Sequence, residues 1–133
     1  MRPRAANCVE VIALAPLDSA THYATHVVPF VRPFTLALVA SLAPHRAGDV
    51  LDHGAGTGEV ALAVHARYPE ALVTALDPNE PFLDALATST AGDSAWLDLV
   101  VGRIEEQPWP APRFDMVLSQ LALMFVSDPA AEL

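Results

Sequence analysis

Apolar and polar positions are arranged along this chain so that short strands can be separated from longer helices. Four runs of five or six residues are rich in aliphatic side chains, and each is followed by polar, proline or glycine residues. Runs of this length with little polar alternation are typical of strands buried on both faces of a parallel sheet. The pattern therefore predicts strands over residues 49–53, 71–76, 97–101 and 114–119.

Between these runs the apolar positions recur at helical spacing. Phe34, Leu38 and Leu42 are four residues apart, which predicts a helix over residues 33–43 that packs through one apolar stripe. Further helices are predicted over residues 57–68, from residue 80 to about 88, and from residue 129 onwards. Because strands and helices alternate, the fold predicted is a Rossmann-like, doubly wound α/β sheet of about four parallel strands with helices on both faces.

The chain divides into a leading segment and one α/β domain. Residues 1–28 show no clean period, apart from a helix start at residues 18–23, whereas residues 29–133 carry all the predicted strands. Only the start of a helix follows the fourth strand, so that strand would lie at an open sheet edge, a position prone to association. We expect either a fragment of a longer domain or an edge covered by a partner or by a second copy of the chain.

The strongest chemical signal lies between Val50 and Glu59. Asp52 comes at the end of a strand, and glycines follow at positions 54, 56 and 58. Glycine permits positive φ and leaves the backbone bare, so a ligand can lie against this turn and against the free N–H groups of the next helix. Asp77 ends the next strand, and parallel strands joined through a helix end at the same sheet edge. Two carboxylates around a glycine turn suit a nucleoside with ribose hydroxyls.

The order Asp-x-Gly-x-Gly-Thr-Gly, followed by an acid at the end of the next strand, resembles the class I S-adenosylmethionine-dependent methyltransferases. Residues 102–109 and 114–120 match later blocks of this family in order and spacing. The resemblance runs from about residue 31 to the C-terminus. Within the family, the chain is similar to the small-molecule enzymes of the ubiquinone and menaquinone biosynthesis type. It implies S-adenosyl-L-methionine as cofactor and a small molecule as methyl acceptor.

The resemblance also implies roles for the matching residues. The three glycines would border the methionine part, with Asp52 organising its amino group, and Asp77 would accept hydrogen bonds from both ribose hydroxyls. Arg103 and Ile104 would flank the adenine; many relatives carry an acid where Arg103 stands, and arginine cannot accept a hydrogen bond. The two residues that end the fourth strand would line the crevice near the sulfonium. The complete predicted cofactor set is Asp52, His53, Gly54, Ala55, Gly56, Thr57, Gly58, Asp77, Pro78, Arg103, Ile104, Ser119 and Gln120.

No residue is marked by its motif as a catalytic base. In methyl transfer the reactive atom belongs to the cofactor, so the protein mainly binds and aligns the reactants. In relatives a comparable leading segment folds over the crevice, which makes residues 1–28 a candidate lid and His22, Tyr23 and His26 candidate bases; a solvated polar segment is the alternative. His53 is expected to be a packed core histidine, and no residues have metal-ligand spacing.

The sequence bears on three alternatives to methyl transfer. A nicotinamide dinucleotide oxidoreductase requires G-x-G-x-x-G, and Glu59 occupies the last glycine position of that pattern. A Walker loop is excluded because no Gly-Lys-Ser/Thr follows. A non-catalytic, truncated half-domain, or a cofactor-binding module completed by a partner chain, is favoured by the missing strands and by the lack of an assignable base.

The composition limits which binding partners and which cellular compartment we expect for this chain. The net charge is −9, with 16 acids against 7 basic residues, so a nucleic acid is not an expected partner. Hydrophobic residues make up 53% of the 133-residue chain, but no run is long enough to span a bilayer. Cys8 is the single cysteine, which excludes an internal disulfide and favours the cytoplasm.

Overall fold

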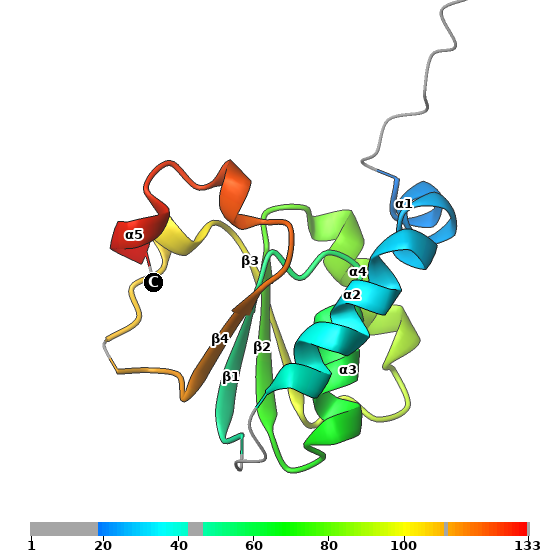
Figure 1. Ribbon diagram of the computed structural model, residues 1–133, viewed down its shortest axis with the longest axis horizontal. Coiled ribbons are helices and arrows are strands. Elements are labelled where there is room, and N and C mark those ends of the chain that lie inside the picture. The colour runs from blue at the N-terminus through cyan, green and yellow to red at the C-terminus, as the bar shows by residue number, and fades with distance from the viewer. Residues whose placement is uncertain (1–18, 43–46, 111, 133) are drawn as a thin grey trace, which may run out of the picture.

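The four predicted strands form one parallel sheet. The computed structural model describes residues 19–42, 47–110 and 112–132. The strands are β1 (Asp49–His53), β2 (Leu72–Asp77), β3 (Leu97–Val101) and β4 (Met116–Ser119). They are hydrogen-bonded in the order β3-β2-β1-β4, and all neighbouring pairs are parallel (Figure 1). The predicted α/β fold is confirmed, and the strand bounds agree with the sequence pattern to within two residues.

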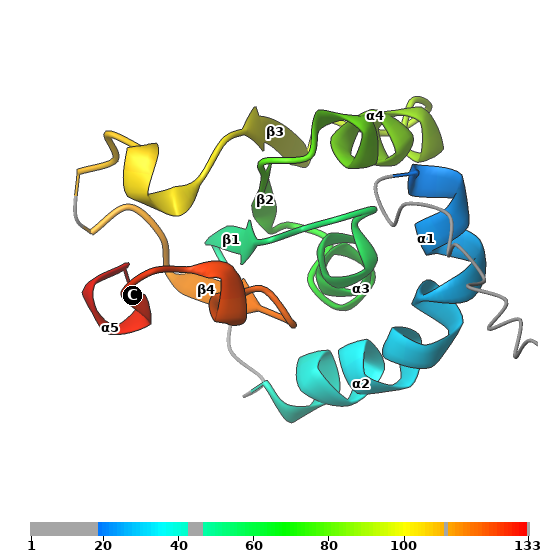
Figure 2. The ribbon, with the colours of Figure 1, turned by 90° about the horizontal axis from the view of Figure 1, so that it is seen from above.

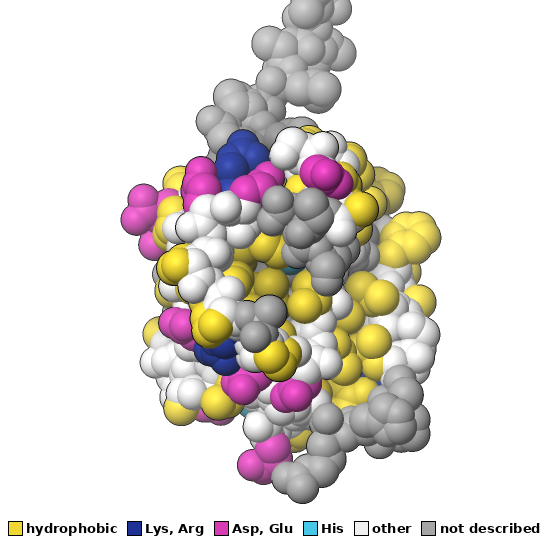
Figure 3. Space-filling model, turned by 90° about the vertical axis from the view of Figure 1, so that its left-hand side faces the viewer, with side chains coloured by type: hydrophobic (Ala, Val, Ile, Leu, Met, Phe, Trp, Pro, Cys, Tyr) yellow, Lys and Arg dark blue, Asp and Glu magenta, His cyan; other side chains and the backbone are white. Residues whose placement is uncertain are grey.

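Most of the helical segments lie on one side of this sheet. The helices are α1 (Ala20–His26), α2 (Val28–Ser41), α3 (Glu59–Arg67), α4 (Glu80–Ser89) and α5 (Pro129–Glu132), with 3-10 turns η1 (Ile104–Glu106) and η2 (Leu123–Phe125). Figure 2 shows α2, α3 and α4 on one side of the strands, and the short η1 and α5 on the other. Seen from the side that carries no long helix, apolar side chains gather over the middle of the molecule, with acidic ones around them (Figure 3).

The core lies between the sheet and the helices α2 and α3. Val50, Val73 and Leu118 come from three adjacent strands and pack with Val60 and Val64 of α3 in one buried cluster. Alternation along each strand sends these side chains to the helical face, because successive residues of a strand point to opposite sides. The predicted inward face of α4 is also confirmed: Phe82, Leu83 and Leu86 are buried.

The predicted packing face of α2 was wrong in part. Phe34 is 70% exposed, although Leu42 packs against the core as expected and Leu38 is half-buried. The helix starts five residues earlier than predicted, at Val28, and it buries the stripe that contains Thr35. Thr35 is 1% exposed, and its hydroxyl donates to the side-chain oxygen of Gln120 at 2.6 Å, so the Thr35 side of the helix faces the end of β4 and the Phe34 side faces outwards.

The strand order places β4 at a sheet edge, as the sequence order predicts. Val117 on this strand is 41% exposed. Within the described residues no single helix is long and apolar enough to cross a membrane; α1 and α2 reach that length and composition only together, and they are bent by 72° at the break between them.

Candidate functional site

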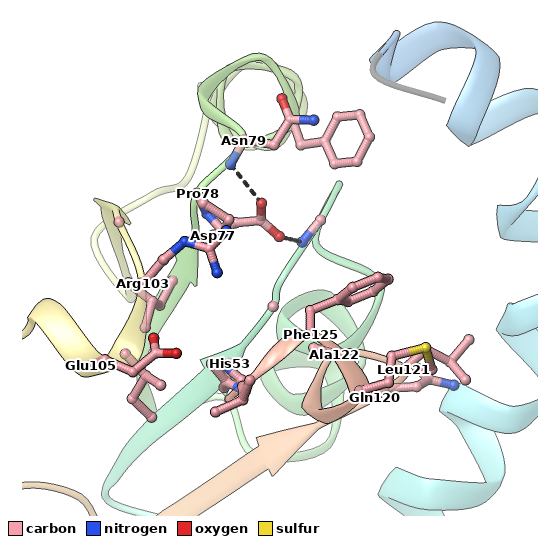
Figure 4. A pocket seen from close by; sticks show the side chains of 18 of the residues that line it. His53, Asp77, Pro78, Asn79, Arg103, Glu105, Gln120, Leu121, Ala122 and Phe125 are labelled. Carbon is pink, nitrogen blue, oxygen red and sulfur yellow. Dashed lines mark hydrogen bonds between the residues drawn. The ribbon is translucent and has the colours of Figure 1, made fainter. Parts of the chain in front are cut away.

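A cavity of about 520 Å³ opens at the carboxyl ends of the strands. Parallel α/β sheets bind ligands at this edge, outside the strand ends. Its walls come from α1, from the turns after β1, β2 and β3, and from the segment after β4 (Figure 4). The lining residues are Tyr23, Val27, His53, Gly54, Gly56, Leu76, Asp77, Pro78, Asn79, Phe82, Gly102, Arg103, Ile104, Glu105, Gln120, Leu121, Ala122, Met124, Phe125 and Val126.

The glycine turn after β1 forms one wall of this cavity. Gly54 and Gly56 have φ values of 72° and 56°, which glycine adopts without the strain that a side chain would bring. The N–H of Gly54 donates to the carbonyl of Leu76 at 2.8 Å, which fixes the turn to the end of β2. A Cβ on Gly54 would collide with the side chain of Ala122, so the segment after β4 lies directly against the turn.

Asp77 projects into the same cavity from the end of β2. Its Oδ2 accepts a hydrogen bond from the N–H of Gly56 at 2.8 Å, and its Oδ1 accepts one from the N–H of Asn79 at 2.8 Å. These bonds are drawn in Figure 4. A carboxylate has about four acceptor sites, so the two backbone bonds orient the group and leave further sites for donors such as a pair of hydroxyls.

Asp52 lies beneath the turn and does not line the cavity. It is one residue short of the end of β1, and its side chain faces α3, where Oδ2 accepts from the N–H of Ala61 at 2.9 Å. Burial raises the pKa of this carboxyl to about 7; the Ala61 N–H opposes that shift, and the negative charge of Asp77 adds to it. The two acids are therefore electrostatically coupled, but only Asp77 meets the cavity, and the role of Asp52 at an amino group stays a prediction.

Within the described part of the leading segment, Tyr23 and Val27 reach the cavity, and Tyr23 is the one of the two with a polar group. Its ring packs against Phe82 at 5.0 Å between centroids, and it lies beside Gly56. Burial raises the pKa of the Tyr23 hydroxyl, and the charges of Asp77 and Glu59 raise it further. The Ser19 side chain caps α1 by accepting the N–H of His22, which helps to hold Tyr23 in place.

The other two predicted bases lie elsewhere on α1. His22 and His26 pack against each other, with ring centroids 4.4 Å apart, and neither lines the cavity. Of the three candidates in the leading segment, the structure therefore brings only Tyr23 to the site.

His53 and Gln120 also line the cavity, and the side chain of each makes a hydrogen bond to a neighbouring residue. The Nδ1 of His53 is 3.0 Å from the Oγ of Ser119, which pairs the last residues of β1 and β4. His53 is 7% exposed, so it is packed as expected, yet it also contributes to the cavity wall. The Gln120 oxygen is bonded to Thr35, which ties the end of β4 to α2.

The turn after β3 supplies Arg103, Ile104 and Glu105 to the cavity wall. The Arg103 N–H donates to the carboxylate of Glu106 at 3.3 Å, and the Arg103 carbonyl accepts from the Gln107 side chain at 2.9 Å. These bonds fold the loop so that Glu105 projects towards the cavity (Figure 4). Glu105 is exposed to solvent, and it also belongs to the cavity lining.

The remaining predicted positions fall outside the main cavity. Ala55 and Thr57 line a separate hollow of about 20 Å³, large enough for one water molecule. The Thr57 hydroxyl is buried and has no hydrogen-bond partner within the described part of the chain, which fits a water at that place. Gly58 lies against Leu86, where a Cβ would collide, so it permits α3 and α4 to pack closely. Cys8 lies outside the described residues.

Sequence reasoning missed one wall of the cavity. The lining residues that it did not single out as site positions include Val27, Asn79, Phe82, Gly102, Glu105, Leu121, Ala122, Met124, Phe125 and Val126. Most of them follow a strand directly, so the rule that ligands bind beyond the carboxyl ends of parallel strands could have marked them. One further signal is absent from the sequence: Leu121 has a φ of 58°, which is unusual for a residue with a side chain.

Comparisons with known proteins agree on one family. The family model described as a methyltransferase domain matches residues 50–133. The chain is 35% identical over 105 residues to a malonyl-[acyl-carrier protein] O-methyltransferase from Laribacter hongkongensis, a match that covers 74% of this chain and 35% of that protein. It is 30% identical over 82 residues to a ribosomal RNA small subunit methyltransferase C from Klebsiella pneumoniae, covering 62% of this chain and 23% of that protein. The chain thus spans about a third or less of the length of these relatives.

Solved structures share the fold. The plantazolicin methyltransferase BpumL, in complex with SAH, superposes with a TM-score of 0.65 at 17% identity, and the match covers 85% of this chain and 44% of that one. At this identity the match bears on the fold alone.

Proposed function

This chain belongs to the class I S-adenosylmethionine-dependent methyltransferases, and from this premise we propose that it binds S-adenosyl-L-methionine in the cavity and transfers its methyl group to a small-molecule acceptor. The observation that carries the proposal is the position of Asp77 beside the glycine turn. Its carboxylate is oriented by two backbone N–H groups and keeps acceptor sites free for hydroxyl donors.

The residues present fit a sulfonium nucleoside. When bound, S-adenosylmethionine supplies an electrophilic methyl group, whose bond to sulfur breaks as the acceptor atom forms its own. In this proposal Asp77 holds the two ribose hydroxyls, and the side-chain-free surfaces of Gly54 and Gly56 border the methionine part. Arg103 and Ile104 flank the adenine, and because arginine cannot accept a hydrogen bond, Arg103 contributes through stacking or through its backbone.

Tyr23 gives the leading segment a role in this site. Its ring covers Gly56 and meets Phe82, so α1 closes one side of the cavity against water. We propose that the described part of the leading segment, residues 19–28, acts as a lid through this contact. Of the three candidate bases, Tyr23 faces the cavity while His22 and His26 do not. Because the pKa of its hydroxyl is raised, Tyr23 keeps its proton near pH 7 and is placed to donate a hydrogen bond to an acceptor rather than to remove its proton.

A small acceptor is supported by size and by charge. The cavity volume of about 520 Å³ falls in the range of small-molecule sites. The chain carries a net charge of −9, which disfavours a polyanionic acceptor such as RNA. A cytoplasmic location, and a second chain or a second copy at the β4 edge, remain predictions. The alternative to the enzyme is a non-catalytic half-domain of the family that binds the cofactor weakly or not at all, or a cofactor-binding module that a partner chain completes.

Calorimetric titration with S-adenosylhomocysteine tests the proposal. We expect saturable binding with one site per chain. Asp77→Ala removes an acceptor of two charge-assisted hydrogen bonds, together worth roughly 3 kcal/mol, so its affinity should fall by about a hundredfold. Asp84→Ala removes an exposed acid from α4 and should bind as the wild type does. A folded, monodisperse protein that binds no S-adenosylhomocysteine would favour the non-catalytic alternative.

A further inference from the structure

The cavity has a polar end and an apolar end. Asp77 at the end of β2 forms the polar end together with Asn79, Arg103 and Glu105, which come from the turns after β2 and β3. The segment 121–126 after β4 forms the apolar end, together with Val27 from the α1–α2 junction. In Figure 4 Arg103 and Glu105 lie on one side of His53, and Leu121, Ala122 and Phe125 lie on the other.

The apolar end is built from side chains that remain open to solvent. Leu121, Met124 and Phe125 are 57%, 68% and 73% exposed, and all three line the cavity. Single exposed apolar residues are ordinary on a protein surface, but three from one short segment around one cavity form a patch of the kind that binds a ligand. This end of the cavity therefore offers apolar surface that an occupant would remove from water.

The backbone of this segment is held in a conformation that brings the patch to the glycine turn. Leu121 has a φ of 58°, a region that costs a residue with a side chain about 1 kcal/mol or more. The next residue, Ala122, packs against Gly54. The turn at Leu121 thus places the apolar wall beside the surface that we assign to the methionine part of the cofactor.

The charges around the cavity favour an uncharged occupant at the apolar end. Within the described lining, Arg103 is the one arginine, and it belongs to the polar end with the acids Asp77 and Glu105. A carboxylate or phosphate placed against Met124 and Phe125 would give up part of its hydration without gaining a cationic side chain as partner. An aromatic ring would instead gain contact with the thioether and with the phenyl ring.

We propose, as a consequence of the methyl-transfer function above, that the apolar end receives the methyl acceptor and selects an uncharged molecule with an apolar ring. Met124 and Phe125 hold the ring, and the nucleoside of the cofactor occupies the polar end. Selection comes from two features of the same wall: its apolar surface and its lack of a cation among the described residues.

Two probes that share one ring system test this selection. 2-Naphthol is uncharged at pH 7, and 2-naphthoate carries a carboxylate at a similar position. Calorimetric titrations of the protein, with and without saturating S-adenosylhomocysteine, should give a dissociation constant for 2-naphthol that is lower by about tenfold or more. Equal or tighter binding of 2-naphthoate by the wild-type protein would overturn the proposal.

A matched pair of variants tests whether the preference for 2-naphthol arises at the apolar end of the cavity. Phe125→Arg places a cation in the apolar end and should reverse the preference in favour of 2-naphthoate. Phe34→Arg makes the same change at an equally exposed phenylalanine, 70% against 73%, which lies on α2 outside the cavity lining. The preference should persist in Phe34→Arg, and a reversal in both variants, or in neither, would overturn the proposal. If 2-naphthol binds but S-adenosylhomocysteine does not, the proposed cofactor function fails and the apolar-site assignment stands.

Discussion

Replacing Asp52 by asparagine tests whether burial raises the pKa of the acid beneath the glycine turn and so makes the stability of the fold depend on pH. Asparagine keeps an oxygen that can accept the Ala61 N–H and removes the ionisable group. The pKa of Asp52 is raised from 3.8 to about 7, so the unfolded chain releases this proton at a lower pH than the folded protein does. The folded state therefore binds more protons between these values, and its stability falls as the pH rises from about 4 to about 7.

The size of the effect follows from the shift. A shift of about three pKa units corresponds to a loss of about 4 kcal/mol in the free energy of unfolding, and this loss is complete once the pH exceeds the folded pKa. About 2 kcal/mol of this loss falls between pH 5.5 and pH 8.5, a range that lies above the isoelectric point of about 4.7. The free energy of unfolding of Asp52→Asn, relative to wild type, should therefore rise by about 2 kcal/mol across that range.

Urea unfolding followed by circular dichroism at several pH values measures this difference. A change in packing caused by the amide would shift the variant by the same amount at every pH, so the change with pH carries the test. Asp98→Asn removes an exposed acid from β3 and should give a curve parallel to that of the wild type. Parallel curves for wild type and Asp52→Asn would refute the argument that burial raises this pKa.

Two further predictions concern the packing that positions the cavity. Leu86 is 0% exposed in the cluster that joins α4 to the sheet, so Leu86→Ala should lower the free energy of unfolding by about 3 kcal/mol in urea titrations; a loss below about 1 kcal/mol would contradict that packing. Thr35→Val keeps the shape of the side chain but removes the donor to Gln120, so the unfolding free energy should fall by about 1 kcal/mol, and an unchanged stability would show that this hydrogen bond contributes nothing.

The strands and the glycine turn could be predicted from the sequence because their signals are local. The aliphatic runs mark β1 to β4, and the spacing of Gly54, Gly56 and Asp77 follows from the βαβ connection. The family resemblance at these residues is confirmed by the family model over residues 50–133. Local pattern was enough here because each feature depends on one strand and the turn that follows it.

The packing face of α2 and the far wall of the cavity could not be predicted in this way. Apolar residues occur all round α2, so periodicity alone did not reveal that Thr35 faces inwards; its bond to Gln120, 85 residues away, decides that. The segment 121–126 has no clear period, and its place beside Gly54 depends on the positive φ of Leu121. Both features arise from contacts between parts of the chain that are distant in sequence.

The most direct test of the central claim is an NMR titration of the ¹⁵N-labelled chain with S-adenosylhomocysteine. If the cavity beside Asp77 is the cofactor site, the amide signals of Gly54, Gly56 and Asp77 should shift and saturate together. Those of Gly48, at the opposite end of β1, and of Gly92, after α4, should stay in place. Saturating shifts at Gly48 or Gly92, with none at the glycine turn, would contradict the account.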